Sequence, residues 1–358
     1  MTVLITGARA PVALDLARKF AAIGERVLVA ESAPAHLCAR STAVSGNFRV
    51  PPPNRAPQAF ADALAAIVKR EGVDLVVPTC EEIFWVARGR LGNALAAPLG
   101  QLRALHSKWE FIQLARSFGL PVPETVLVTS PYVELERPFI MKPVFSRFAT
   151  KVRVVADAVG DLGGVEWVAQ ERLTGRQICT YSLAAGGRVV AHAAYETGFT
   201  ASGACVSFEP IEHEQIESWV TKFVEKSVFG GQIAFDFIVT EDGRALPLEC
   251  NPRATSGVHL FDERLAQAMI SPPDEVLRPD PGTRRMIGLA MLTFGLTSGP
   301  LGEWARIMAG SRDVIAVPGD RGPFLSQFGV LWHNWLRSLW TRRSLVECST
   351  YDIEWDGR

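Results

Sequence analysis

Apolar and polar positions divide the chain into regions of different periodicity. In the first third, short β-rich runs at residues 3–5, 27–30 and 74–78 are separated by helical patterns at 12–23 and 60–71. Strands that alternate with helices predict a parallel sheet covered by helices, because each helix carries the chain back across the sheet. The pattern therefore predicts a Rossmann-like α/β domain over residues 1–105.

The region that follows begins with a clearly bounded helix and continues mainly with strands. Ser107 occupies the expected N-cap position of this helix and Gly119 the stop position. The later segments are, in order, strand-like runs at 139–144, 151–155 and 167–171, a hairpin turning at 186–187, a helical stretch at 212–229 and a hairpin at 233–251. This order predicts an antiparallel α+β domain over residues 106–265.

Residues 266–358 form a predicted C-terminal extension with a proline-rich segment at 272–281. Its most regular part is a helical pattern at 324–340, with Phe, Leu and Trp near one face and arginines close by, at positions 337, 342 and 343. Such a face favours substrate capping or a subunit contact in a homodimer. A helix that lies on a membrane surface is the alternative.

Composition excludes several classes of protein. With 358 residues, of which 48% are apolar and 21% charged, the chain suits two or three globular units. The 37 basic and 38 acidic residues give a net charge of −1, which argues against a broad nucleic-acid surface. The six cysteines lie far apart, no export signal begins the chain, and the apolar stretch at 286–301 is too short to span a membrane. We expect a cytoplasmic protein.

The hairpin at residues 233–253 carries the clearest chemical pattern. If Asp242-Gly243 is a two-residue turn, Glu241 pairs with Arg244, and Asp236 lies opposite Glu249. Alternation then predicts a core face and a polar face. The core face would hold Phe235, Phe237, Val239, Leu246, Leu248 and Cys250, and the polar face Asp236, Glu249 and Asn251.

Two carboxylates that face each other on a sheet repel, and an otherwise apolar segment gives them no obvious reason to be there. A hard cation with oxygen ligands would stabilise the pair of Asp236 and Glu249, and Asn251 adds a neutral oxygen. A solvated strand face is the alternative interpretation. Pro247 cannot donate to a ladder, so we expect it at an edge or in an outward-facing position.

This hairpin resembles the metal and phosphate site of the ATP-grasp superfamily, particularly its carbamoyl-phosphate-synthase-like carboxylate–amine ligases. The resemblance lies in Asp236 and the run Glu-Cys-Asn-Pro-Arg that ends at Arg253. It covers about residues 1–265 and implies a Rossmann-like domain followed by two α+β lobes that grip ATP. By this resemblance Asp236, Glu249 and Asn251 would hold Mg²⁺ or Mn²⁺, and Arg253 would stabilise charge on the transferring phosphoryl group.

Two lysines have counterparts in the family. Lys108 and Lys142 resemble the lysines that contact phosphate oxygens in these enzymes. Lys142 also has a reason of its own, because a lysine inside an apolar strand needs a partner for its charge.

The run 170–177, Gln-Glu-Arg-Leu-Thr-Gly-Arg-Gln, resembles the family's hinge between the two lobes, where adenine and ribose are held. The resemblance implies nucleotide contacts by Gln170, Glu171, Leu173 and Gln177. Gln177 stands where many members have glutamate. The phosphate-covering loop, usually glycine-rich, has no glycine here; Arg147 would replace some of its contacts, and a plain surface loop is the alternative.

The resemblance implies a ligase in which a carboxylate attacks the γ-phosphate of ATP and an amine then displaces phosphate from the acyl phosphate. The partners would be a small carboxylate and a small amine. Arg9, Glu81 and Glu82 are candidate acceptor contacts, and His259 is the one histidine for which we consider an acid–base role. The alternatives are a carboxylase or kinase on the same scaffold, a catalytically silent nucleotide-binding relative, and an oxidoreductase with a dinucleotide at Gly7.

Overall fold

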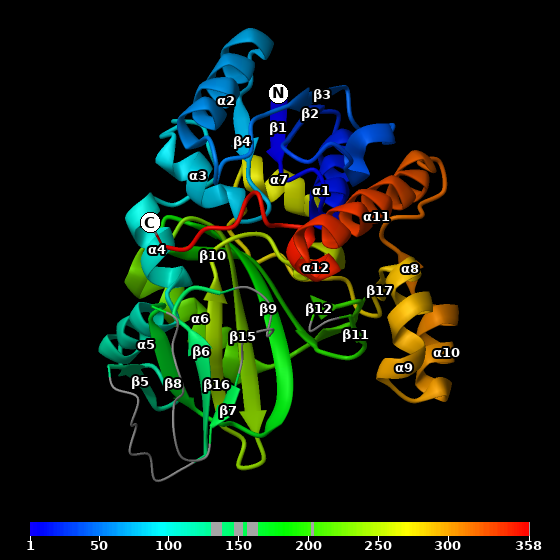
Figure 1. Cartoon of the computed structure of the whole chain (residues 1–358). Coiled ribbons are helices and arrows are strands. Elements are labelled where there is room, and N and C mark those ends of the chain that lie inside the picture. The colour runs from blue at the N-terminus through cyan, green and yellow to red at the C-terminus, as the bar shows by residue number, and fades with distance from the viewer. Residues whose placement is uncertain (130–137, 147–152, 156–163, 202–203, 358) are drawn as a thin grey trace.

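The computed structural model describes residues 1–129, 138–146, 153–155, 164–201 and 204–357. It contains a four-stranded parallel sheet near the N-terminus and two antiparallel sheets of four and five strands, so the α/β and α+β classes predicted from the sequence are both present (Figure 1). The domain boundaries at residues 105 and 265 stay predictions.

The N-terminal unit is a parallel sheet with the strand order β3-β2-β1-β4. Alternate residues of β1 enter two different buried clusters, Leu4 in one and Val3 and Ile5 in the other, so both faces of the sheet are covered. The elements are β1 (Thr2–Thr6), α1 (Pro11–Ala22), β2 (Arg26–Glu31), η1 (Leu37–Arg40), β3 (Gly46–Arg49), α2 (Pro57–Glu71), β4 (Leu75–Val77), α3 (Glu82–Arg88) and α4 (Leu99–His106). The edge strand β3 has no apolar run, and the sequence pattern did not predict it.

A small antiparallel sheet follows, with the strand order β5-β8-β6-β7. Its elements are α5 (Lys108–Ser117), β5 (Thr125–Val128), β6 (Phe139–Pro143), β7 (Arg153–Val155) and β8 (Trp167–Glu171). The predicted boundaries of α5 are confirmed: the Ser107 hydroxyl accepts a hydrogen bond from the Glu110 N–H at 3.1 Å, and Gly119 has a φ of +72° just beyond the helix. This cap places Lys108 at the first position of the helix.

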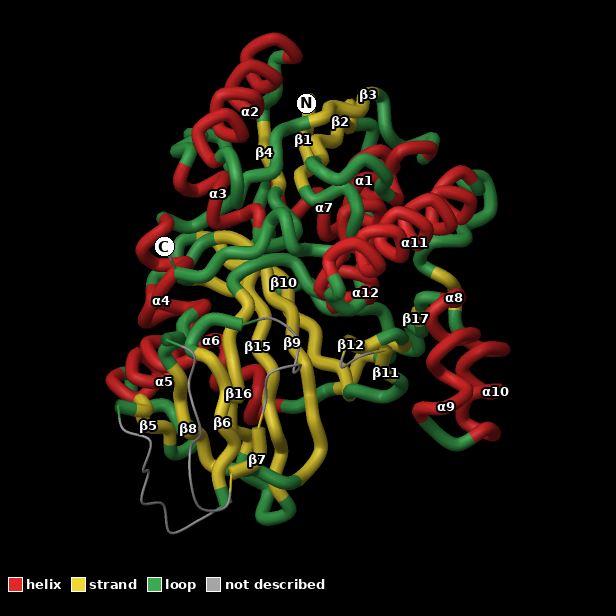
Figure 2. The backbone as a smooth tube through the Cα atoms, viewed as in Figure 1, coloured by secondary structure: helices red, strands yellow, loops and turns green. Residues whose placement is uncertain are grey.

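The large antiparallel sheet has the strand order β14-β10-β9-β15-β16. Its strands are β9 (Gly175–Ala185), β10 (Arg188–Glu196), β14 (Pro210–Ile211), β15 (Gly231–Thr240) and β16 (Ala245–Asn251). Helix α6 (Glu214–Ser227) packs an aromatic face on it: Trp219 and Phe223 stack at 5.2 Å, and both rings contact Phe235 on β15. Figure 2 shows the strands of this sheet grouped beneath the N-terminal unit.

The hairpin β15–β16 confirms one part of the predicted register and corrects another. Asp236 pairs with Glu249 as predicted, and β16 is an edge strand, which suits Pro247. The turn, however, takes up residues 241–244, and the register shifts by one residue beyond Asp236, so that Phe237 pairs with Pro247.

Because a one-residue shift exchanges the two faces of a strand, the faces predicted for Leu246 and Leu248 were wrong, although Leu246 is buried as predicted. Ala245 takes the core position beside Val239, whereas Leu246 pairs with Ile238 on the opposite face. Leu248 lines a cavity. The predicted core residues Phe235, Phe237, Val239 and Cys250 are in the buried cluster.

The other elements are three short strands that precede β14 and the C-terminal part of the chain, which returns to the N-terminal unit. Helix α7 lies against α1, and α11 lies over η1, to one side of the large sheet in Figures 1 and 2. The elements are β11 (Thr200–Ala201), β12 (Ala204–Cys205), β13 (Ser207–Phe208), η3 (Ser256–Leu260), α7 (Arg264–Ile270), β17 (Arg285–Met286), α8 (Gly288–Ala290), η4 (Met291–Gly295), α9 (Leu296–Ser298), α10 (Leu301–Gly310), β18 (Arg312–Asp313), α11 (Gly322–Thr341) and α12 (Leu345–Cys348). The predicted helix at 324–340 is confirmed as α11.

Candidate active site

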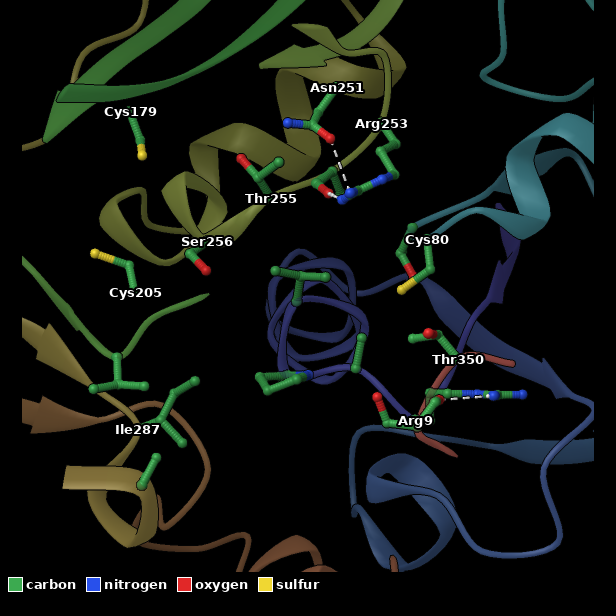
Figure 3. Close-up of a pocket in the computed structure, with 18 of the residues that line it drawn as sticks. Arg9, Cys80, Cys179, Cys205, Asn251, Arg253, Thr255, Ser256, Ile287 and Thr350 are labelled. Carbon is green, nitrogen blue, oxygen red and sulfur yellow. Dashed lines mark hydrogen bonds between the residues drawn. The ribbon is translucent and has the colours of Figure 1, made fainter. Parts of the chain in front are cut away.

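A cavity of about 730 Å³ lies where the N-terminal unit, both antiparallel sheets and α11 meet. Residues far apart in the sequence line it, and Figure 3 shows Asn251 and Arg253 on one side and Arg9 and Thr350 on another. Nine of the site candidates are in its lining: Lys108, Lys142, Gln177, Asp236, Glu249, Asn251 and Arg253 of the predicted nucleotide and metal site, together with Arg9 and His259. The structure therefore gathers them in one place.

Asp236 and Glu249 bring two acidic groups together at one end of the cavity. Burial and the neighbouring Glu249 raise the pKa of Asp236 to about 7. Burial alone would raise the pKa of Glu249 as well, but the ammonium groups of Lys108 and Lys142 outweigh this effect and hold it below its usual range. Below about pH 7 the pair thus carries a proton, held mainly by Asp236, and a negative charge on Glu249.

The two predicted lysines converge on this pair from the small sheet and α5. The Lys108 ammonium lies 3.4 Å from Glu249 Oε2 and donates to the Ser146 carbonyl at 3.0 Å. The Lys142 ammonium donates to Gln170 Oε1 at 2.8 Å and to the Leu248 carbonyl at 2.9 Å. Both side chains are almost fully buried, and burial lowers the pKa of Lys142 to about 8.

The predicted hinge joins the two sheets, since β8 ends at Glu171 and β9 begins at Gly175. Gln170 is fully buried, and its amide is bonded to Lys142 and to Thr125, so the side chain orients the lysine. Glu171 accepts a hydrogen bond from the Glu124 N–H, and Leu173 is half-buried. Their assignment to adenine stays a prediction.

The backbone geometry of the hinge requires a glycine at position 175. Its φ is +151°, and a Cβ at this position would lie 2.1 Å from the Val239 carbonyl oxygen on the neighbouring strand. No other residue fits so close to a backbone.

Arg253 follows β16 and turns back toward its end. Its guanidinium donates to Asn251 Oδ1 at 3.0 Å and to the Ala254 carbonyl at 3.2 Å, while the Asn251 amide lies 3.5 Å from Glu249 Oε1. A chain of polar contacts therefore runs from the arginine to the carboxylate pair. Arg147, the remaining predicted contact, lies outside the described residues.

The sequence of residues 105–257 matches the family described as the ATP-grasp domain. The match begins at α4 and ends in η3, and so contains both sheets that meet at the cavity, the hinge and the carboxylate hairpin. Residues 105–257 are an ATP-grasp domain. No curated protein matches the chain in sequence.

Solved structures with an ATP-grasp domain share the fold at low sequence identity. An L-amino acid ligase from Bacillus licheniformis superimposes with a TM-score of 0.60 at 15% identity, over 76% of this chain and 74% of that one. An N5-carboxyaminoimidazole synthetase from Staphylococcus aureus, complexed with ADP, gives 0.63 at 12% identity, over 79% and 80%. The biotin carboxylase domain dimer of a Hydrogenobacter thermophilus 2-oxoglutarate carboxylase, with MgADP, ADP and bicarbonate, gives 0.55 at 13%, over 71% and 64%. At these identities the likeness shows the fold alone.

Elements outside the ATP-grasp domain line the far end of the cavity. The start of α1 contributes Ala10, Pro11 and Val12, and no side chain caps this helix. Helix α11 contributes Val330, His333, Asn334 and Arg337. The sequence reasoning missed the α11 residues, although His333, Asn334 and Arg337 share helical spacing opposite the apolar stripe.

Arg9 lines the cavity, but its predicted contact with an acceptor does not fit its partners. The guanidinium is paired with Glu31, bonded to Asp352 at 2.6 Å and to the Ser349 carbonyl at 3.0 Å. Burial would raise the pKa values of Glu31 and Asp352, but Arg9 outweighs burial and lowers both. Arg9 thus joins the N-terminal unit to the C-terminal segment.

Glu81 and Glu82 are also turned inward. Glu82 accepts hydrogen bonds from the Thr6 hydroxyl and from the Thr79 and Cys80 N–H groups, which ties the ends of β1 and β4 together. Glu81 accepts from the Trp355 N–H at 3.3 Å. Among the described residues neither is part of the cavity lining, so their role as substrate contacts stays a prediction that their inward orientation does not favour.

His259 lies in the cavity wall beside α1. Its Nδ1 is 2.8 Å from Asp15 Oδ2, and the same carboxylate pairs with Lys19. The imidazole is fully buried against Phe208. An acid–base role for His259 stays a prediction.

Proposed function

We propose that this protein is an ATP- and Mg²⁺-dependent ligase that joins a carboxylate to an amine through an acyl phosphate. The observation that carries the proposal is the convergence of two buried lysines and two facing carboxylates at one end of a cavity that lies between the sheets of an ATP-grasp domain. The Bacillus licheniformis and Staphylococcus aureus proteins that share this fold are a ligase and a synthetase by name, which supports the reaction class.

The lysine end suits the phosphates of a nucleotide. Lys108 and Lys142 bring two positive charges out of water, and among the described residues of the cavity lining they meet Glu249 as the acid that a lowered pKa keeps charged. Phosphate oxygens would add negative charge where it is most needed and would favour the protonated form of Lys142. The hinge residues 170–177 would then hold the base and the ribose.

The carboxylate end fits a divalent cation. Asp236 has a raised pKa because it lies buried beside Glu249, and a cation in place of its proton would remove that repulsion. Asp236, Glu249 and Asn251 would be the protein ligands of Mg²⁺ or Mn²⁺. In the described part of the chain no group of three or more His, Cys, Asp or Glu comes together as a metal site, so phosphate oxygens would complete the coordination. Bound there, the metal would neutralise negative charge on the phosphates.

The chain's own residues would act mainly by position and charge. An oxygen of the substrate carboxylate attacks the γ-phosphorus, ADP departs, and the nitrogen of the amine then attacks the acyl carbon and releases phosphate. Arg253 would bind the transferring phosphoryl group, and Lys108 and Lys142 the other phosphate oxygens. Gln170 would hold Lys142 in place, and the cavity walls would exclude water from the acyl phosphate.

The far end of the cavity suits an anionic acceptor. The uncapped start of α1, Arg253 and Arg337 all face this region, whereas Arg9 is neutralised by Glu31 and Asp352. Helix N-termini and arginines both attract carboxylates. A small carboxylate would therefore enter from the α1 and α11 side, with its reacting oxygen toward Arg253.

Three other functions remain alternatives. A carboxylase or kinase would use the same residues with bicarbonate or another phosphoryl acceptor, and a silent relative would bind nucleotide without turnover. A dinucleotide at Gly7 is disfavoured by Glu31, which ends β2 where an acid would bind the ribose but is already paired with Arg9.

Melting temperatures of the purified protein with ADP and Mg²⁺, with ADP and EDTA, and with NAD⁺ test the proposal. A rise with ADP that requires Mg²⁺ and disappears in Glu249→Ala supports the nucleotide site. A screen of carboxylate and amine pairs for release of ADP and phosphate then identifies the reaction. A rise with NAD⁺ alone, or none with ADP, contradicts the assignment.

A further inference from the structure

Helix α11 is oriented with its polar side inward and its apolar side outward. Gln327, His333, Asn334 and Arg337 face inward or line the cavity. The outer face carries Phe324, Leu325, Phe328, Leu331, Trp332, Trp335, Leu339 and Trp340, all exposed. Trp332 is 60% exposed and Trp340 87%. This is the reverse of the usual arrangement of a surface helix.

The outer face also lacks charge. Between Arg321 and Arg342, a segment that the structure describes completely, the one Lys, Arg, Asp or Glu is Arg337. Its guanidinium is turned away onto Tyr351, 3.5 Å from the ring centre, and bonds to the Tyr351 hydroxyl. A contiguous apolar face of this length marks a surface that another body covers.

Basic residues stand at both ends of this face. Arg321 precedes the helix, and Arg342 and Arg343 follow it, all exposed. Asp320, the acid next to Arg321, is buried and paired with Arg18. The nearest acid after the helix, Glu347, accepts hydrogen bonds from Ser344. An apolar face rich in tryptophan with cations at its ends matches the interface of an anionic bilayer, where indole rings lie at headgroup depth and arginines meet lipid phosphates.

We propose that the outer face of α11 docks the protein onto the surface of an anionic lipid bilayer. The helix would lie in the plane of the interface with its apolar side chains among the upper acyl chains. No helix in the described part of the chain is long and apolar enough to cross a membrane, so the contact would be peripheral. Helices α9 and α10 lie on the same side of the molecule as α11 in Figure 1. Exposed Leu292, Phe294, Leu296 and Leu301 belong to η4, α9 and α10.

A second copy of the chain is the competing occupant, and the charges disfavour it. If two α11 helices paired antiparallel about a two-fold axis, Arg321 of each copy would approach Arg342 and Arg343 of the other. If they paired parallel, the same arginines would meet each other. Like charges therefore collide in both orientations, whereas lipid phosphates neutralise all three arginines.

Co-sedimentation of the full chain with vesicles tests the proposal, without nucleotide present. We expect binding to vesicles of phosphatidylcholine mixed with phosphatidylglycerol. Trp332→Asp should lower the partition coefficient at least about tenfold. The change removes an indole that would be buried in the bilayer and adds a negative charge that the anionic lipids repel. Arg342→Glu/Arg343→Glu should also lower it at least about tenfold on the anionic vesicles, and the difference between anionic and pure phosphatidylcholine vesicles should disappear.

Matched variants control for general effects. Val228→Asp places an acid at another exposed apolar position, which has the left-handed backbone that Asp tolerates, and Arg88→Glu/Arg116→Glu reverses two exposed arginines elsewhere. Both should bind anionic vesicles nearly as wild type does. Each α11 variant should keep the wild-type melting temperature and its response to ADP and Mg²⁺, so the outcome is independent of the proposed ligase activity.

Three results would overturn the proposal. They are no binding to anionic vesicles, binding that Trp332→Asp leaves unchanged, and a dimer in sedimentation equilibrium that Trp332→Asp dissociates in the absence of vesicle binding.

Discussion

Trp355 stacks on Phe84, with the ring centres 4.6 Å apart and the planes 12° from parallel. The contact joins the C-terminal segment to α3. The same indole meets Phe145 edge-on at 5.7 Å, just beyond the strand that carries Lys142, and lies near His106, just before Lys108. One tryptophan thus supports the backbone on both sides of the lysine pair.

Replacement of Trp355 tests how strongly this segment is held. Trp355→Ala should lower the free energy of unfolding by about 3–5 kcal/mol, as expected for a large buried aromatic side chain. Trp340→Ala is the control, because that indole is 87% exposed, and its effect should stay within about 0.5 kcal/mol. Urea unfolding measures both. Equal effects of the two variants would show that the Trp355 contacts contribute little.

The buried pairing of Arg9 with Glu31 and Asp352 leads to a second prediction. Arg9→Ala leaves two buried carboxylates without their cation and should cost about 3–5 kcal/mol of unfolding free energy. Arg26→Ala removes an exposed pairing with Glu71 and should cost no more than about 1 kcal/mol. Chemical denaturation compares them. A loss below that of Arg26→Ala would contradict the structural role of Arg9.

Asp236→Asn tests metal binding without disturbing the fold. Since the pKa of Asp236 is about 7 in the absence of a cation, the neutral amide resembles the protonated acid below that pH and should cost the nucleotide-free protein little stability. The rise in melting temperature that ADP produces with Mg²⁺, beyond its effect with EDTA, should disappear. Asp242→Asn, at the exposed turn of the same hairpin, should keep the full response. A full response in Asp236→Asn would exclude Asp236 as a ligand.

Lys142 gives a prediction about pH. Its pKa is about 8 in the folded protein, whereas an unfolded lysine titrates near about 10.4, so between these values the unfolded chain binds more protons. The contribution of Lys142 to the free energy of unfolding should therefore rise with pH across this window and be constant below it. Wild type minus Lys142→Met, measured by urea unfolding without nucleotide, should show a rise of about 1–3 kcal/mol. Exposed Lys69→Met should show none; a flat Lys142 difference would refute the lowered pKa.

Gly175 in the hinge and Gly243 in the turn allow the energetic cost of backbone strain to be distinguished from that of steric overlap. Gly243 has a φ of +81° with open space around it, so Gly243→Ala should cost about 1–2 kcal/mol from strain alone. Gly175→Ala would also force a methyl group against the Val239 carbonyl and should cost about a further 1–3 kcal/mol. Thermal unfolding compares the pair. Similar losses would mean that β9 and β15 separate easily at the hinge.

Patterns along the sequence predicted most of the fold and the cluster of Asp236, Glu249 and Asn251, because caps, turns and hairpin pairing depend on neighbouring residues. The cap at Ser107, the stop at Gly119 and the pairing of Asp236 with Glu249 each depend on residues close in sequence, and each is confirmed. The positions of Leu246 and Leu248 were wrong because turn length and a bulge set them, and the Asp242-Gly243 signal fixes neither.

Long-range pairings carried no readable signal. Arg9 and Asp352 lie at opposite ends of the sequence, and an arginine beside a glycine-containing loop has the same appearance whether it binds a substrate or an internal carboxylate. Gln170 was predicted as a nucleotide contact from the family hinge, but its bonds to Lys142 and Thr125 depend on how three strands align. Both are consequences of tertiary structure.

The cavity draws its walls from α1, both sheets, α11 and residues 348–350, and one buried apolar cluster contains Leu4, Phe235 and Trp355. The ATP-grasp domain of this protein therefore does not contain the whole pocket by itself. Cut out at residues 105 and 257, it would lose the lining residues that α1, α11 and residues 348–350 contribute and would expose part of its core to water. A chimaera that keeps this pocket therefore has to inherit α1, α11 and residues 348–350 from the same parent as the domain.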